Sequence, residues 1–383
     1  MTSQTRPSTA GSDIATTQSA DSSLLAVDRA IADLRRGGFA VVRCEAGDAL
    51  LVQAAEAVTP QSLERVATLS GAVPLLVLTA QRAAALKIAD GSQGVIALDI
   101  VEGTPAQAVR DIADPASAIS FRLPPHRQPD GSLQGCCLAA VRLTKLARLL
   151  PAALAAPLTV ADPVAWAQSH SLLVVDADEI IDYDRRAARS LKPVSQARVP
   201  LAGAEDARIV AYRPRDGGIE HLAIVIGEPK TDSPVLVRLH SECFTGDLLG
   251  SLRCDCGDQL RGAIAAISEA GSGVLIYLAQ EGRGIGLVNK LRAYQLQDDG
   301  ADTIDANEQL GFDADERVYL PAAQILRDMG FTRVRLLTNN PAKVEALAAC
   351  GIEVAERVPH AFPATAHNEK YLATKATRSG HLF

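Results

Sequence analysis

Three of the seven cysteines lie within a stretch of fourteen residues and have the spacing of a metal site. They are Cys243, Cys254 and Cys256. Thiolates suit zinc in tetrahedral sites, and three protein ligands leave one position for water, which is the pattern of a catalytic zinc. Zinc lowers the pKa of its bound water to about 7 and so supplies hydroxide at neutral pH. Buried core thiols, or a structural zinc completed by His240, would explain the same spacing.

A glycine-rich segment, Gln280–Gly286, follows a short apolar run and precedes a helical pattern. Alternate glycines let the backbone approach a ligand closely, as in phosphate-binding loops. Glu281 and Arg283 add a carboxylate and a guanidinium, which suit a purine edge and a phosphate. A tight turn without any ligand would contain the same glycines.

Two further polar segments are candidates for the same site. Asp313–Arg317 has acidic residues followed by an arginine, and a solvated acidic loop is the simpler interpretation. Further along, a polar strand end runs into a helix start, which is a plausible anion site. Helix capping fully explains Asn340 and Pro341, so only Thr338 and Lys343 require a functional reason.

The composition narrows the function classes. With 383 residues, 48% hydrophobic and 22% charged, the chain is expected to be a soluble, cytoplasmic protein of two or three domains. No apolar stretch reaches the roughly 18–20 residues that a membrane span needs, and the N-terminus lacks the apolar centre of a signal peptide. An odd number of cysteines argues against a disulfide framework.

The net charge of −7 argues against nucleic-acid binding and makes any cluster of basic residues informative. Such a cluster in the second half predicts a positive pocket for an anionic substrate, although a solvated surface would also explain Arg261 and Arg292. Its members are Arg238, Arg253, Arg261, Arg283, Lys290, Arg292, Arg317 and Lys343.

Strands alternating with helices predict a mixed α/β (α+β) fold of two domains. We expect a disordered tail at 1–22, one domain at 23–190 and a second at 191–383, with a linker around 184–197. Predicted strands are 39–43, 74–79, 172–176, 235–240, 274–278 and 333–337. Predicted helices are 24–36, 105–113, 258–270, 287–297 and one that starts at Pro341 and ends at Gly351.

The four polar segments, with 289–298, Asp302-Thr303, Ala306-Asn307 and 380–382, resemble GTP cyclohydrolase II from about Pro193 to Phe383. The resemblance implies zinc-dependent hydrolysis of GTP to 2,5-diamino-6-ribosylamino-4(3H)-pyrimidinone 5′-phosphate, formate and pyrophosphate, the first step of riboflavin biosynthesis. It also implies a homodimer, one zinc per subunit, and magnesium on the triphosphate. A non-catalytic GTP-binding regulatory module with a structural zinc is the alternative.

The resemblance assigns a role to each matching residue. Asp315 matches a proton acceptor, Tyr294 an active-site tyrosine near the base, and Arg317 a residue proposed to attack the α-phosphate. Because the pKa of arginine lies above about 12, stabilisation of transition-state charge is an alternative role for Arg317. The zinc ligands match Cys243, Cys254 and Cys256. The GTP contacts match Arg238, Leu239, His240, Ser241, Glu242, Gln259, Glu281, Gly282, Arg283, Thr303, Thr338 and Lys343.

The chain departs from the family pattern at Ala279, where a basic residue is common, and at 318–322, which could reshape the loop that holds Arg317.

The N-terminal half is similar, over residues 26–60, to 3,4-dihydroxy-2-butanone 4-phosphate synthase, which is often fused upstream of this cyclohydrolase. That enzyme needs an acidic loop to hold magnesium and abstract protons. The corresponding segment, Arg43–Asp48, has lost most of its carboxylates, and His126 and His170 lie in unrelated contexts. We expect the fold to persist and the synthase chemistry to be lost; a bifunctional enzyme that retains the synthase is the alternative.

Overall fold

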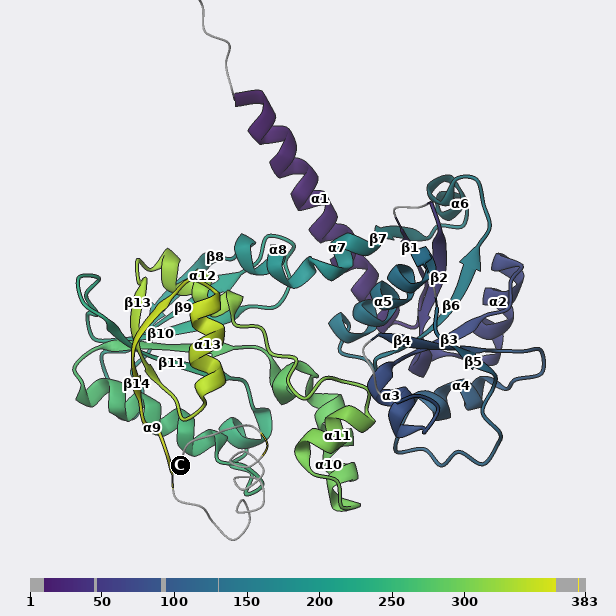
Figure 1. The fold of residues 1–383 in the computed structure, drawn as a ribbon. Helices are drawn as coiled ribbons and strands as arrows, with labels where there is room; N and C mark the ends of the chain where they lie inside the picture. The colour runs from purple at the N-terminus through teal and green to yellow at the C-terminus, as the bar shows by residue number, and fades with distance from the viewer. Residues whose placement is uncertain (1–9, 45–46, 91–93, 130, 363–377, 379–383) are drawn as a thin grey trace, which may run out of the picture.

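The computed structural model describes residues 10–44, 47–90, 94–129, 131–362 and 378. Two mixed seven-stranded sheets with flanking helices lie side by side, and the short helices α7 (Ala177–Ile181) and α8 (Tyr183–Ser190) connect them (Figure 1). The predicted mixed α/β class is therefore confirmed. Among the described helices, none is both long and apolar enough to span a bilayer.

The N-terminal unit has the strand order β5-β4-β3-β6-β2-β1-β7, antiparallel except for the parallel pair β1 and β7. Its strands are apolar on both faces, so two hydrophobic cores sandwich the sheet. Its strands are β1 Ala40–Arg43, β2 Ala49–Ala54, β3 Leu75–Thr79, β4 Val95–Asp99, β5 His126–Arg127, β6 Ala152–Leu158 and β7 Leu173–Asp176. Its remaining helices are α1 Ala10–Arg35, η1 Ala55–Ala57, α2 Pro60–Ser70, α3 Ala80–Ala85, α4 Ala106–Ala113, α5 Gly131–Leu146 and α6 Pro163–Ser169.

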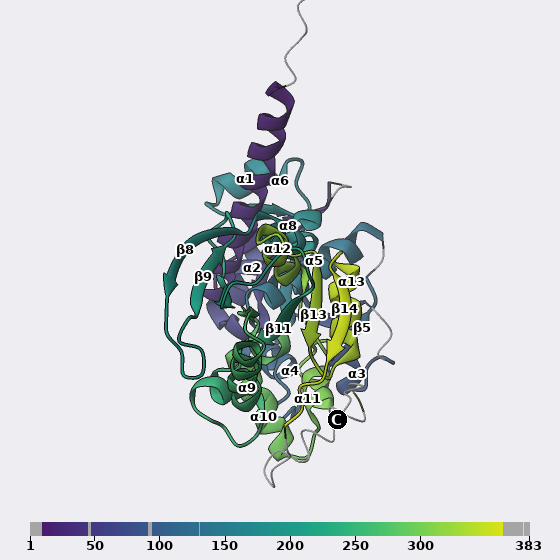
Figure 2. The same ribbon diagram turned by 90° about the vertical axis from the view of Figure 1, so that its left-hand side faces the viewer.

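The C-terminal unit has the strand order β14-β13-β11-β12-β10-β9-β8. Strand β12 is the middle strand. Next to it, β11 pairs in parallel with both β12 and β13, whereas β8, β9 and β10 form an antiparallel edge (Figure 2). Its strands are β8 Lys192–Arg198, β9 Arg208–Arg213, β10 His221–Ile226, β11 Val235–Ser241, β12 Gly273–Leu278, β13 Arg333–Leu337 and β14 Glu353–Val358. Its helices are η2 Phe244–Leu248, α9 Cys256–Glu269, η3 Glu281–Gly284, α10 Leu287–Asp298, α11 Thr303–Gln309, α12 Leu320–Asp328 and α13 Pro341–Ala349.

Local sequence explains how α13 begins and ends. The Asn340 side chain accepts a hydrogen bond from the Ala342 amide at 3.0 Å, and Pro341 occupies the first turn, where its missing N–H costs nothing. The helix ends at Ala349, and Gly351 follows with a φ of 81°. The predicted capped helix is confirmed.

The predicted linker at 184–197 is wrong, because this segment forms most of α8 and β8. Strand β8 is an edge strand whose side chains are all exposed, so it lacks the apolar alternation that reveals strands in sequence.

The predicted tail extends to residue 22, but α1 begins at Ala10 and residues 1–9 lie outside the described part. Among the side chains described in α1, burial begins at Ser23 and Leu24. The predicted family match at 380–382 also lies outside the described residues.

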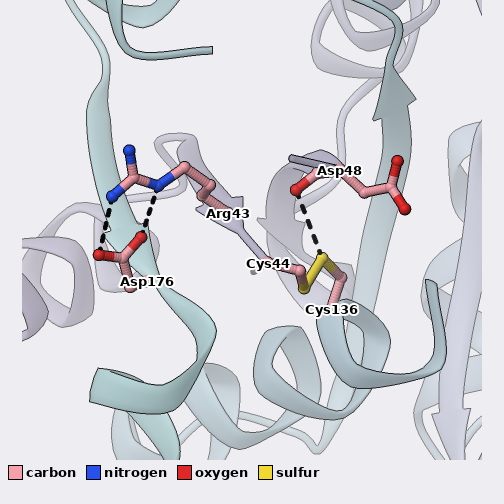
Figure 3. The surroundings of a disulfide bond; sticks show 5 residues. All are labelled: Arg43, Cys44, Asp48, Cys136 and Asp176. Atoms are coloured by element: carbon pink, nitrogen blue, oxygen red, sulfur yellow. Dashed lines mark hydrogen bonds and ion pairs between the residues drawn. A yellow bond between two sulfur atoms is a disulfide. The ribbon is translucent and has the colours of Figure 1, made fainter. Parts of the chain in front are cut away.

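A disulfide joins Cys44, directly after β1, to Cys136 in α5 (Figure 3). The odd cysteine count argued against disulfides, so this bond was not predicted. Cys44 and Cys136 are 92 residues apart, and nothing in the sequence shows that the end of β1 meets α5. Beside it, the Arg43 guanidinium makes a two-pronged ion pair with Asp176 of β7, at 2.7 and 2.9 Å. The disulfide therefore ties α5 to the end of β1.

Candidate active site

The candidate site lies where three parallel strands of the C-terminal sheet end. Cys243 follows β11 by two residues, Glu281 follows β12 by three, and Thr338 follows β13 directly. Because β11 pairs in parallel with both neighbours, these three strand ends meet at one edge. The carboxyl edge of parallel strands is the usual ligand-binding edge of α/β sheets.

The three predicted metal ligands come together. The sulfur atoms of Cys243, Cys254 and Cys256 all lie within 4.8 Å of one another, and Cys243 and Cys254 are 3.8 Å apart. Two zinc–sulfur bonds of about 2.3 Å at a tetrahedral angle place their sulfurs about 3.8 Å apart. Among the described residues, this is the one group of three His, Cys, Asp or Glu side chains close enough to share an ion. The donor set therefore fits zinc.

Gly246 forms the floor of the sulfur cluster. A Cβ atom on this residue would lie 2.7 Å from the Cys254 sulfur and 3.1 Å from the Cys243 sulfur, so a side chain would displace the ligands. Its amide lies 3.4 Å from the Cys243 sulfur and donates to it. The glycine of the segment 240–247 is thus required by close packing around the thiols.

The thiols are poised for a cation. Hydrogen bonds from Cys254 and Cys256, together with Lys290, lower the pKa of Cys243 strongly. The hydrogen bond to Cys243 in turn raises the pKa of Cys254 to about 11, since one thiolate disfavours a second beside it. Three thiolates at this separation need a metal ion to offset their charge.

A network of hydrogen bonds around Asp247 supports the cysteine cluster. The Asp247 carboxylate accepts hydrogen bonds from the Cys243 amide at 3.0 Å and from the Tyr277 hydroxyl at 2.9 Å. The same carboxylate lies 3.0 Å from Nε2 of His240, whose pKa is lowered by burial. His240 is thus held by Asp247 and stacked on Tyr277, which places it beside the cluster and not among its ligands.

Lys290 on α10 links the cluster to the glycine-rich turn. Its ammonium group lies 3.1 Å from the Cys243 sulfur, 2.9 Å from Oγ1 of Thr245 and 2.8 Å from Oε1 of Glu281. Burial opposes the lysine charge, but the hydrogen bond to Glu281 and the charge of Cys243 raise its pKa overall. Lys290 is therefore a charged donor to a metal-ligand sulfur.

A cavity of about 470 Å³ opens above the sulfur atoms. Six cationic side chains and four carboxylates line it, so the pocket is locally positive in a chain of net charge −7. Of the predicted site residues, the cavity walls include Arg238, His240, Ser241, Glu242, Cys243, Cys254, Cys256, Gln259, Glu281, Gly282, Arg283, Tyr294, Thr303, Arg317 and Lys343.

Three predicted site residues do not line this cavity. The Leu239 side chain is buried in the hydrophobic core, and its carbonyl accepts a hydrogen bond from Lys343 at 3.1 Å. The Thr338 hydroxyl accepts from the Asn340 amide at 3.0 Å. Asp315 lies behind Arg317 and binds its Nε at 2.7 Å. Leu239 and Asp315 thus support the wall residues Lys343 and Arg317, whereas Thr338 supports the start of α13.

The lining also contains polar residues to which the family resemblance gave no role. Arg253 and Lys290 were expected there only as members of the basic cluster, and Gln297, Asp298 and Asn307 were not expected there. Within the described part of the chain, the buried Nδ2 of Asn307 and the buried Nε of Arg238 have no hydrogen-bond partner. Unsatisfied buried donors in a cavity wall are expected to bind a ligand. For most of these residues the only available signal was their place in the matched segments 289–298 and 306–307.

Two glutamates in the cavity wall differ in how many hydrogen bonds their carboxylates already accept. Glu281 is only 3% exposed, and its carboxylate already accepts from Lys290 and from the amides of Phe244 (2.6 Å) and Gly282 (2.9 Å). It therefore holds the glycine-rich turn against the cysteine loop and has little capacity left for a purine. The Glu242 carboxylate accepts no hydrogen bond from the described residues, and burial raises its pKa. Glu242 is thus the better candidate for contacting a base.

Arg238 and Arg317 face the cavity from the sheet and from the loop before α12. Arg238 donates to the Leu337 carbonyl at 2.9 Å, and burial lowers its pKa to about 10, so it stays charged at neutral pH. Arg317 is paired with Asp315, whose pKa is lowered by this hydrogen bond despite burial. The departure at 318–322 forms the start of α12, with Pro321 in its first turn.

Comparison with known proteins identifies the family. A family model described as GTP cyclohydrolase II matches residues 192–359. A protein from Azospirillum brasilense named GTP cyclohydrolase-2 is 54% identical over 371 residues, which cover 95% of each chain. The chain belongs to the GTP cyclohydrolase II family. The resemblance seen in the sequence motifs is thereby confirmed.

The relationship to this family of enzymes includes the N-terminal half. Riboflavin biosynthesis protein RibBA from Phocaeicola vulgatus is 36% identical over 393 residues, covering 93% of this chain and 96% of that protein. Among solved structures, one that is similar is RibBX of A. baumannii, a two-domain 3,4-dihydroxy-2-butanone 4-phosphate synthase. The match covers 88% of this chain and 99% of that one. The sequence identity of that pair is 20% and the TM-score 0.37.

Proposed function

We propose that this GTP cyclohydrolase II uses zinc to hydrolyse GTP to 2,5-diamino-6-ribosylamino-4(3H)-pyrimidinone 5′-phosphate, formate and pyrophosphate, the first step of riboflavin biosynthesis. The observation that carries the proposal is the trio of cysteine sulfurs, within 4.8 Å of one another, at the base of a cavity rich in cations. The family relationship supplies the reaction, and the sulfur geometry supports its metal dependence.

Zinc would be held by Cys243, Cys254 and Cys256, and when bound it would supply a Lewis acid and an activated water at the cavity floor. The chain's own groups prepare that floor. Lys290 offsets thiolate charge by donating to the Cys243 sulfur, and Asp247 fixes the backbone of the same residue. Such supporting contacts to metal ligands orient them and tune the metal.

The triphosphate would meet the cationic side of the cavity. Arg317 presents a guanidinium paired with Asp315, and arginine stays protonated because its pKa lies above about 12, which favours a role in stabilising charge over a role as nucleophile. Arg238, Arg283 and Lys343 add further positive charge along the same walls. Magnesium on the triphosphate would offset charge before pyrophosphate leaves.

We also propose that the active form is a homodimer. Large apolar side chains are exposed on η2, on the loop after it and on α10, next to the site: Phe244, Leu248, Leu249, Leu252, Val288 and Leu291. Exposed apolar patches of this kind usually mark an interaction surface. Sedimentation analysis of Leu249→Glu should show a shift from dimer to monomer; an unchanged dimer would contradict this surface.

The N-terminal unit is proposed to lack synthase activity. Cys44, within the segment that should carry the acidic loop, is bonded to Cys136, and Asp48 is the acidic residue described there. Among the described residues of this unit, no three His, Cys, Asp or Glu side chains lie close enough to share a metal ion. Incubation with ribulose 5-phosphate and magnesium should therefore give no turnover, whereas measurable product would restore the bifunctional alternative.

The primary test is release of formate and pyrophosphate from GTP, with and without a zinc chelator. Release that stops on chelation and returns with zinc is the expected result. GTP binding without formate release would instead support a regulatory module with a structural zinc.

The role of Arg317 is tested by Arg317→Lys in the same assay. A charge stabiliser should leave activity reduced by about a hundredfold but measurable, because one charged donor of this type contributes about 10²–10³ in rate. Trapping of a covalent guanylyl adduct on Arg317 of the unsubstituted protein would contradict this role.

A further inference from the structure

The wall of the cavity that carries Lys290 and Tyr294 is made by α10 and α11, and these helices pack on the N-terminal unit. Leu296, Leu310 and Phe312 belong to the same hydrophobic core as Leu78, Ile112 and Leu150 of the N-terminal unit. Figure 1 shows α10 and α11 between the two units, next to α3. One wall of the GTP cavity is therefore supported by a unit that contributes none of the residues lining it.

Hydrogen bonds reinforce this packing at both ends of the helical pair. Nδ2 of Asn289 donates to the carbonyls of Arg148 at 3.2 Å and Leu149 at 3.4 Å. At the other end, the Thr79 hydroxyl donates to the Gly311 carbonyl at 2.8 Å. The position of α10 and α11 is thus fixed from outside the C-terminal sheet.

Arg148 also reaches the glycine-rich turn itself. Its guanidinium donates to the Ala279 carbonyl at 2.8 Å, two residues before Glu281. Its stem packs on Gly286, where the φ is +86° and a Cβ would lie 3.1 Å from the Cβ of Arg148. Arg148 is therefore in contact with the turn just before its first residue and at its last.

Lys145 holds the second loop of the site. Its ammonium group lies 2.6 Å from Oε1 of Glu316, and both side chains are largely buried. The Glu316 amide donates to the Arg283 carbonyl at 3.0 Å, so this loop is bound to the glycine-rich turn as well. The loop with Glu316 continues directly into Arg317.

These contacts lie beside a cavity between the two units. A cavity of about 260 Å³ separates α5 and its C-terminal extension from the back of the two loops. Arg148 and Lys145 both line it, as do Gln280, Gly284 and Glu316. Arg148 and Lys145 each reach one of the two loops across this cavity. The cavity leaves space into which the loops could shift if these contacts were lost.

We infer that Arg148 and Lys145 of the N-terminal unit are positioning residues for the cyclohydrolase, setting the two loops that carry Arg283 and Arg317. This inference rests on the proposed function. It assigns the N-terminal unit a supporting role in the GTP reaction, independent of any synthase activity. Displacements of about 1 Å in residues that orient a substrate can reduce rates by about a hundredfold.

The test compares Arg148→Met with Arg127→Met in the full-length, zinc-loaded protein. Methionine keeps an apolar stem against Gly286 but removes the donor to Ala279. Arg127 is an exposed arginine of β5 in the same unit, paired with Asp99 at 3.4 Å and remote from the loops, so it serves as the matched control. Arg148→Met should lower kcat/KM for GTP at least tenfold with an unchanged unfolding temperature, and Arg127→Met should leave both unchanged.

A second comparison uses the ion pair, in case Arg148→Met fails to fold. Lys145→Glu and Glu316→Lys should each lower kcat/KM at least tenfold, and the double variant should recover to within about threefold. Variants as active as the unsubstituted protein, or losses that merely follow a lower unfolding temperature, would overturn the inference. An unsubstituted protein that releases no formate would instead refute the proposed function, so the two failures are distinguishable.

Discussion

Cysteines gather at two places in this molecule, and their surroundings give them opposite chemistry. At the end of β11, Cys243 and its two partners share one polar cluster with Lys290 and open into a cavity. At the end of β1, Cys44 and Cys136 are bonded to each other against a tightly packed core. A charged donor and room for a ligand distinguish the first place from the second.

The comparison also extends to the neighbouring thiol. Burial raises the pKa of Cys137, next to Cys136, to about 12, so this thiol stays protonated and inert. The pKa of Cys243 moves in the opposite direction, with Lys290 among the causes. The residue type alone therefore does not separate the proposed metal ligands from an inert thiol; the groups around each cysteine do.

The largest expected effect comes from exchanging one sulfur at each place. Cys254→Ser should lower the rate of formate release at least about a thousandfold, because zinc would lose one of its three protein ligands. Cys136→Ser should leave the rate within about threefold of the original. Formate release by both purified variants, with zinc content measured alongside, provides the check; equal losses in the two would remove the distinction between the two places.

An intermediate effect is expected at Lys290. Lys290→Met removes the charged donor to the Cys243 sulfur while keeping a stem of similar length. Zinc affinity should fall about 10- to 100-fold, as for other contacts that support metal ligands. Competition with a chromogenic chelator measures this without any turnover. Unchanged affinity would show that the lysine serves only to hold Glu281.

The smallest effect on activity is expected when the disulfide is removed. The free energy of unfolding should fall instead. The bond closes a loop of 92 residues, for which a chain-entropy argument gives about 4.6 kcal/mol of stabilisation, whereas about 2–4 kcal/mol is typical of disulfides. Urea unfolding of Cys44→Ser/Cys136→Ser should show that the free energy of unfolding falls by about 2–5 kcal/mol, with kcat for GTP nearly unchanged. A large loss of kcat at full stability would show that the bond acts on the cyclohydrolase directly.

Much of the site was predictable because its residues follow strand ends in short segments. The spacing of Cys243, Cys254 and Cys256 specified a three-sulfur site, and the alternate glycines after β12 marked the turn that approaches it. The central strands were predictable for a related reason. Their β-branched runs, such as Val235–His240, are buried on both faces, and this pattern is local.

The remaining features depend on contacts between distant parts of the chain. Lys290 lies 47 residues from the Cys243 sulfur to which it donates, and nothing local to α10 specifies that contact. Cys44 and Cys136 meet only because β1 and α5 pack together. Strand β8 has no apolar side to reveal it, so it was mistaken for a linker. Contacts such as that between Arg148 and Ala279 likewise depend on how two units pack.

The most direct measurement is the metal content of active, purified protein by elemental analysis, paired with its formate release from GTP. The account predicts one equivalent of zinc per chain and a rate that falls in proportion as zinc is removed. Full activity in protein with no stoichiometric zinc would contradict it, since the three sulfurs would then have no part in the reaction.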